Sequence, residues 1–309
     1  MAKIPTKEAC QEYLERLRWP AGFRCARCGS AEAWRVRALW ECAGCGYQNS
    51  VTAGTIFQDT RIPLPVWFRA MWWVSGQTNA ATALGLQREL ELKRYETAWT
   101  MLRRLRRAMV RPGRDLLTGR VELDGCNVRC EEKGLGGALN LERGLIFIAA
   151  EEQGSEVGRI RMRHVVYAST ASLVAFVQDS VAPGSVLLTN DVVRYRPLES
   201  RGYYHEVRFP ERRKKDWSES EAMPRVRKMT SALKQWLMES QQGAVSRKLL
   251  DDYLDEFTFQ FNLRQSERRG ELFLRLAQQA VTADPVPSDR IVDRNSANAT
   301  AKPQSDGAT

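Results

Sequence analysis

The chain has 309 residues, 43% of them hydrophobic, and carries 47 Lys and Arg against 37 Asp and Glu, which gives a net charge of +10. This length allows two or three domains with a sizeable core. Because no apolar run reaches ~18 residues and the stretch MAKIPTKEACQEYL has no signal-peptide h-region, we expect a cytoplasmic protein without membrane helices. The positive charge suits a polyanionic partner, most often nucleic acid, and an odd number of cysteines, seven, favours metal binding over disulfides.

Two pairs of cysteines define the first predicted domain, residues 1–60. Cys25 and Cys28 form one C-x2-C knuckle, Cys42 and Cys45 form a second, and thirteen residues separate the pairs. Two such knuckles aim four thiolates at one ion, and the stretch AWRVRALWE between them alternates like a β-hairpin. The spacing predicts a zinc ribbon with structural Zn²⁺, since four sulfur ligands leave no open position for catalysis. Cys10 lies outside this pattern, as do Cys126 and Cys130, and the last two are interpreted as ordinary residues.

Residues 61–112 predict helices that are dense in Trp, Leu and Arg. Leu84 to Leu90 fits a short helix, Glu91 to Arg94 a turn, and the segment from Tyr95 a longer helix with one apolar stripe. The other side of the longer helix carries four arginines, Arg103, Arg104, Arg106 and Arg107. We interpret the pair as a helix-turn-helix motif whose arginines contact phosphate or guanine in DNA. The alternative is a solvated charged face on a core helix.

A mixed α/β pattern occupies residues 120–281, after a linker that contains Pro and Gly. Strands are predicted in GRVELDGCNV, GLIFIAAEE and EVGRIRMRHVV, then a helix in TASLVAFVQDSV and a fourth strand in SVLLT. This order resembles the opening of an RNase-H-like domain, in which carboxylates on the first strand and at the end of the fourth share two Mg²⁺ ions. Asp124 and Asp191 stand at these two places.

The last part of the chain predicts one more helix and a tail. The helix lies in SRKLLDDYLDEFTFQFNLR, and its acids are interpreted as a solvated face rather than a metal site: Asp251, Asp252, Asp255 and Glu256. Residues 282–309 contain few large apolar residues and predict a disordered tail. The expected fold class is α/β in a multi-domain α+β chain, with a zinc ribbon, a helix-turn-helix, an RNase-H-like mixed sheet and a disordered tail.

Several long motifs cover about residues 5 to 281, among them CARCGS…CAGCGYQNSVTAGTIF, YETAWTMLRRLRRAMVRPGR, GRVELD and YRPLESRGYYHE. In these motifs the chain resembles the DDE transposases of a group of bacterial insertion sequences. The resemblance implies that a zinc ribbon, a helix-turn-helix and an RNase-H-like catalytic domain follow one another. It also implies binding to the element's terminal repeats, Mg²⁺-dependent phosphodiester hydrolysis, strand transfer into target DNA, and a homo-oligomer on the DNA.

The catalytic positions of that family match this chain only in part. Asp124 falls on the first catalytic Asp, and Lys234 matches a family Lys that we expect to contact DNA. The second Asp corresponds to Asn190, with Asp191 one residue late and, by strand alternation, on the other face unless a bulge restores it. The third position corresponds to Arg227, where relatives have Glu, Asn or His. Asp124 and Asp191 therefore remain the candidates for catalysis and Mg²⁺ binding, in a partly degenerate site.

Two rival functions stay open beside a transposase. A catalytically inactive remnant would bind the terminal repeats and compete with an active transposase. A zinc-ribbon adaptor would bind other proteins rather than DNA. His205, which matches the family's His in GY-x-H, is interpreted as lying near the DNA or the active site.

Overall fold

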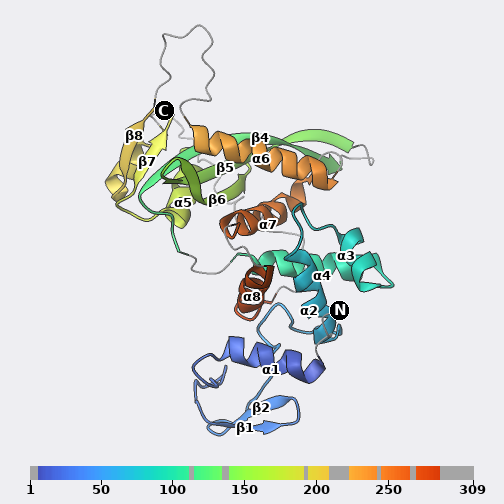
Figure 1. Ribbon diagram of the computed structural model, residues 1–309. Coiled ribbons are helices and arrows are strands. Elements are labelled where there is room, and N and C mark those ends of the chain that lie inside the picture. The colour runs from blue at the N-terminus through green and yellow to red at the C-terminus, as the bar shows by residue number, and fades with distance from the viewer. Residues whose placement is uncertain are drawn as a thin grey trace, which may run out of the picture.

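The structure is a computed structural model that describes residues 6–110, 115–133, 139–190, 194–208, 223–241, 245–264 and 269–285. Figure 1 shows a small N-terminal sheet with one helix, a group of helices, and a larger sheet with helices on both faces. The predicted mixed α/β class is confirmed. The predicted tail, residues 282–309, lies outside the described residues from position 286 onward. In the described part, no helix is long and apolar enough to cross a membrane.

Helix α1 (Lys7–Arg18) and three short strands form the N-terminal unit. The helix begins after Thr6, whose hydroxyl accepts a hydrogen bond from the Ala9 N–H at 3.2 Å. The strands make an antiparallel sheet in the order β1 (Ala33–Val36), β2 (Leu39–Cys42) and β3 (Gln48–Asn49). β1 and β2 are the hairpin expected between the cysteine pairs. Because Cys10 and Leu14 of α1 are buried in the helical core, α1 ties this unit to the rest of the protein.

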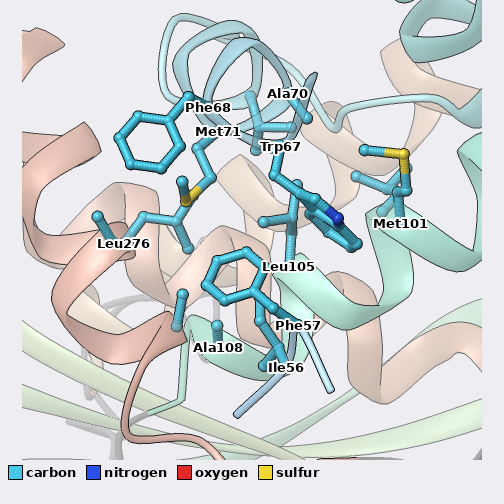
Figure 2. Close-up of a cluster of buried hydrophobic side chains, with 14 of the residues drawn as sticks. Ile56, Phe57, Trp67, Phe68, Ala70, Met71, Met101, Leu105, Ala108 and Leu276 are labelled. Carbon is cyan, nitrogen blue, oxygen red and sulfur yellow. The ribbon is translucent and has the colours of Figure 1, made fainter. Parts of the chain in front are cut away.

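Helices from both ends of the chain share one core. α2 (Leu64–Val74), α3 (Ala83–Leu90) and α4 (Tyr95–Ala108) come from the N-terminal part, and α8 (Arg269–Ala280) comes from the C-terminal part. In Figure 2, side chains of α2, α4 and α8 point into this core, among them Trp67, Met71, Leu105 and Leu276. The sequence places α8 in the domain of residues 120–281, whereas the structure packs it among the N-terminal helices.

The larger sheet has six strands in the order β6-β5-β4-β7-β8, with β9 beside β4. The strands are β4 (Arg120–Lys133), β5 (Leu139–Gln153), β6 (Glu156–Val165), β7 (Val186–Thr189), β8 (Tyr204–Val207) and β9 (Val245–Ser246). β4, β5 and β6 pair antiparallel, whereas β7 runs parallel to β4 and β8 parallel to β7. The helix α5 (Thr170–Ser180) connects β6 to β7, and the short 3-10 helix η1 (Arg196–Arg201) precedes β8.

Helices cover both faces of this sheet, so alternate residues of β4 meet different helices. Val121 and Leu123 pack in the cluster that includes α5. Cys126 and Val128 pack in the cluster that includes α6 (Pro224–Gln241) and α7 (Leu250–Asn262). Because side chains alternate along a strand, Glu122 and Asp124 belong to the face that α6 covers.

Candidate functional site

The four paired cysteines come together in the N-terminal unit. Their Sγ atoms all lie within 4.8 Å of one another, with Cys25 to Cys45 at 3.7 Å and Cys28 to Cys42 at 3.5 Å. Zn–S bonds of about 2.3 Å in a tetrahedron require S–S separations of about 3.8 Å, so this arrangement fits Zn²⁺. Gly29 and Gly46, each one residue past a knuckle, adopt positive φ angles of 74° and 65°, which allows the chain to turn back at each pair.

The side chain of Asn49 connects the two knuckles by hydrogen bonds. Its side chain is buried, with the Oδ1 accepting the Ala26 N–H at 2.9 Å and the Nδ2 donating to the Tyr47 carbonyl at 3.0 Å. The same Nδ2 lies 3.6 Å from Cys25 Sγ. Burial by itself raises the pKa of the Cys25 thiol, but hydrogen bonds from the Cys28 and Arg27 backbone and from Asn49 outweigh it and lower that pKa to about 6. Asn49 thus favours the thiolate form that binds zinc.

Replacing Asn49 with alanine is expected to weaken zinc binding by about tenfold or more, because outer partners of a metal ligand contribute at this level. Competition with a colorimetric chelator measures the effect. Gln48→Ala is the matched control, since that exposed amide bonds only Glu41 in the described structure and faces away from the cysteines. Equal zinc affinity in Asn49→Ala and Gln48→Ala would contradict the assignment.

Asp124 and Asn190 meet on the α6 face of the larger sheet. The parallel register pairs Glu122 with Leu188, so Asp124 and Asn190, each two residues further on, occupy matching places. Asn190 Nδ2 makes a long hydrogen bond of 3.5 Å to Asp124 Oδ2, and the Gly125 N–H donates to Asp124 Oδ1 at 2.7 Å. Asp191 lies outside the described residues. The side chain that faces the first-strand acid in this structure is therefore an amide.

Helix α6 brings cationic residues to the same region. Arg227 and Lys234 are exposed and stand two turns apart, with Thr230 between them. Burial raises the pKa of the Cys126 thiol, and the charge of Asp124 raises it further. A hydrogen bond from Thr230 and the charge of Lys234 lower the same pKa. These influences place Thr230, Lys234 and Asp124 around one thiol. The region is thus mixed in charge, with the Asp124 carboxylate and the Asn190 amide on the sheet and the cation Lys234 on the helix.

His205 lies beside the strand end that carries Asn190. Its Nε2 is 2.7 Å from the Thr189 hydroxyl, and its ring stands 5.6 Å from the ring of Tyr195. The Nδ1 lies 3.8 Å from a Glu199 carboxylate oxygen. Because only 2% of the His205 side chain is exposed, it holds β7 and β8 together rather than presenting an imidazole to solvent.

The arginines of α4 are paired inside the protein. Arg103 Nε lies 2.9 Å from Asp252 Oδ2, and Arg106 Nε lies 2.8 Å from Glu256 Oε2. Arg104 donates to the carbonyls of Ile56 and Gln58 at 3.1 and 3.0 Å. Arg103, Arg104 and Arg106 therefore make contacts inside the protein in this structure, and the contact of these arginines with DNA stays a prediction.

The acids of α7 also differ from their interpretation. Asp252 and Glu256 were expected on a solvated face, but they are buried and form ion pairs with α4. Arg107, the fourth arginine of α4, is half-buried. In this structure, DNA contact by Arg103 or Arg106 would require a buried ion pair to break, which is costly.

Two functional side chains were missed in the sequence. Asn49 follows the second knuckle by four residues, and only its hydrogen bonds to Ala26 and Tyr47 show that it connects the two pairs. Glu122 looks like one of two exposed acids that alternate with Val121 and Leu123, yet it is fully buried. One signal in the sequence could have pointed to Glu122. Met223, which precedes the helix that begins at Pro224, has no side-chain oxygen, so this helix needs a capping group from elsewhere in the chain.

Comparison with protein families gives two matches. Residues 116–262 match the model of an ISXO2-like transposase domain, and residues 5–48 match the model of a transposase zinc-ribbon domain, both from the same insertion-sequence group. The first match spans Asp124, Asn190, Arg227 and Lys234, and the second spans all four paired cysteines. A search of curated proteins finds no match.

Proposed function

Since the chain belongs to the IS1595 family of transposases, with a zinc ribbon and an ISXO2-like DDE domain, we propose that it binds the ends of an insertion sequence and cleaves them weakly or not at all. The observation that carries this proposal is the amide of Asn190 beside Asp124. A carboxylate at that place would add negative charge, whereas the Asn190 amide donates a hydrogen bond to one oxygen of Asp124.

The arrangement of the sheet supports an RNase-H-like domain. Three antiparallel strands, a crossover helix and two parallel strands on the other side of β4 follow the order expected for that fold. In such a site Mg²⁺ supplies activation of the attacking oxygen and stabilisation of the leaving oxygen. Asp124 would be one oxygen ligand for it, while Arg227 adds positive charge where relatives have a residue without a fixed cation. These substitutions reduce the negative charge that holds a hard cation.

Cleavage of a labelled element end tests the proposal directly. With Mg²⁺ or Mn²⁺, we expect the native chain to cleave very slowly or not at all. Combining Asn190→Asp, Asp191→Gly and Arg227→Glu is expected to raise the rate by restoring a carboxylate in register and removing the cation. Asp124→Asn in that background should remove the gain.

One pattern of results would reverse the assignment. If the native chain cleaves at a rate typical of transposases, and Asp191→Asn abolishes cleavage while Asn190→Ala does not, then Asp191 is the second ligand. A chain that binds element ends without cleaving them would instead act as a competitor of an active transposase, and the amide of Asn190 beside Asp124 favours that second function.

We further propose where the α3–α4 pair contacts DNA. The N-terminal end of a recognition helix ordinarily reaches the bases. Lys93 and Arg94, which lead into α4, are exposed, as is Arg88 of α3, and Tyr95 is 47% exposed. These residues are free of the buried ion pairs that hold the second half of α4.

Replacing Lys93 and Arg94 with alanine is expected to weaken DNA binding and to lower the log–log salt slope by about 0.9 for each phosphate that the variant no longer neutralises. Fluorescence anisotropy across a salt series measures both. The control removes the same charge from exposed positions of α1, with Lys7→Ala and Arg16→Ala. Equal slopes in the two double variants would place the DNA surface away from the start of α4.

A further inference from the structure

We infer that Glu122 is a positioning residue: it fixes the start of α6 over the strand that carries Asp124, and so determines where Arg227 stands above a bound DNA phosphate. The inference rests on the proposed DNA-binding function for the consequence at Arg227. The contact between Glu122 and α6 does not depend on DNA binding.

The carboxylate of Glu122 caps a helix from another part of the chain. Glu122 Oε2 accepts the Arg225 N–H at 2.7 Å and the Val226 N–H at 3.0 Å. Since the Arg227 N–H bonds the Met223 carbonyl at 3.0 Å, Met223 occupies the cap position and Pro224 the first helical position. Arg225 and Val226 are then the second and third helical residues, whose N–H groups a capping oxygen normally accepts.

Met223 has no side-chain oxygen with which to cap its own helix. Its side chain is buried in the apolar cluster between α6 and the sheet. Glu122 replaces the missing cap from β4, and a negative charge at a helix N-terminus also interacts favourably with the helix dipole. The start of α6 is thereby attached to the sheet by a polar contact as well as by apolar packing.

Arginines compensate the buried charge of Glu122. Arg225 Nη1 lies 3.0 Å from Glu122 Oε1 and 2.8 Å from Glu152 Oε1, and Arg208 Nη1 lies 3.6 Å from Glu122 Oε1. Glu122 is fully buried, so removing its charge would leave Arg225 and two backbone N–H groups with fewer acceptors. This is a built contact rather than a surface ion pair.

The position of Glu122 explains why Arg227 should respond first. Glu122 and Asp124 lie two residues apart on the same face of β4, about 7 Å along the strand. Arg227 directly follows the two capped residues. Lys234 stands two turns further along α6, where Leu233 and Trp236 are buried against the sheet. Loss of the cap should therefore displace the first turn and Arg227 while leaving Lys234 in place.

Hydrogen exchange tests the contact in the full-length zinc-loaded protein. We expect the Arg225 and Val226 amides to be protected in the native chain and to exchange at least about tenfold faster in Glu122→Gln, with the amides around Leu233 unchanged. Glu206→Gln is the matched control, because that half-exposed carboxylate belongs to the same network but contacts Arg120. Unchanged exchange at Arg225 and Val226 would overturn the inference. If Glu122→Gln fails to fold, Glu122→Asp keeps the charge with a shorter reach, and the same comparison applies.

A double-mutant cycle tests the consequence for DNA. Affinity for a fluorescein-labelled DNA duplex at low salt is measured for Glu122→Gln, Arg227→Ala and both together. If Glu122 acts through Arg227, Glu122→Gln weakens binding several-fold in the native background and has little effect once Arg227 is gone. A general structural role would give additive losses and would overturn the positioning role. If Arg227→Ala alone leaves affinity unchanged, the proposed use of this site by DNA fails, while hydrogen exchange still decides the cap.

Discussion

Cys42→Ser is expected to remove zinc and to unfold the ribbon between about residues 20 and 50, while α1 keeps its place. The strands β1, β2 and β3 are two to four residues long and bury few side chains, so metal binding supplies much of their folding free energy. The loss should stop at α1, because Cys10 and Leu14 are buried in the helical core rather than in the ribbon. Metal analysis should find about one zinc per native chain and much less in the variant.

Hydrogen exchange locates that unfolding. Amides of β1 and β2 should lose protection in Cys42→Ser, whereas those of α1 should keep it. Cys10→Ala is the control for loss of a buried thiol, since Cys10 lies outside the cluster and this variant should retain zinc. A native protein purified without zinc, or a Cys42→Ser variant with a protected β1–β2 hairpin, would exclude a structural zinc site.

Local features of the fold could be predicted from the sequence. Cysteine spacing identified the ribbon because a knuckle needs only neighbouring residues. The period of apolar residues placed α3, the turn at Glu91 and α4 close to their observed bounds, because helix packing repeats every three to four residues. The family register put Asn190 at the place that faces Asp124, and the structure has the Asn190 amide 3.5 Å from that acid, while Asp191 lies outside the described residues.

Contacts between distant segments could not be predicted in this way. Arg103 and Asp252 are 149 residues apart, and Arg106 and Glu256 are 150 apart. Each set of charges formed one stripe on its own helix, and each stripe was interpreted as facing solvent or DNA. Glu122 was missed for the same reason: alternation tells which face a side chain occupies, but not that α6, a hundred residues later, covers that face.

The spacing of those charges is a feature of the sequence that indicates ion pairs between α4 and α7. Arg103 and Arg106 are three residues apart, and Asp252 and Glu256 are four apart, so each pair lies on one side of its helix. Two helices that cross with these sides facing can form both ion pairs at once. Arg103 and Arg106 therefore hold α4 against α7 of the sheet domain, so their role in this structure is to stabilise the packing of these two helices.

Glu256→Ala is expected to destabilise the protein by about 3–5 kcal/mol, because it leaves the buried Arg106 guanidinium without its counter-charge. Arg106 Nε lies 2.8 Å from Glu256 Oε2, and Arg106 is 3% exposed while Glu256 is fully buried. The two residues also satisfy both backbone groups of Ala81. Glu256 Oε1 accepts the Ala81 N–H at 2.8 Å, and Arg106 Nη2 donates to the Ala81 carbonyl at 2.7 Å. Urea unfolding measures the loss of unfolding free energy, and hydrogen exchange of the α3 amides in a separate experiment shows where the protein is loosened.

Two comparisons decide whether burial of the charge is the cause of that loss. Replacing both partners, with Arg106→Met and Glu256→Leu, should cost clearly less than Glu256→Ala, because no unpaired charge remains buried. Asp179→Ala, which breaks the exposed pair with Arg163, should cost under about 1 kcal/mol. If the double replacement costs as much as the sum of its single changes, Arg106 and Glu256 act independently, and an unpaired buried charge is not the cause of the loss in Glu256→Ala. If Glu256→Ala costs no more than Asp179→Ala, Arg106 finds water or another partner, and α4 is not held to the sheet domain by this ion pair.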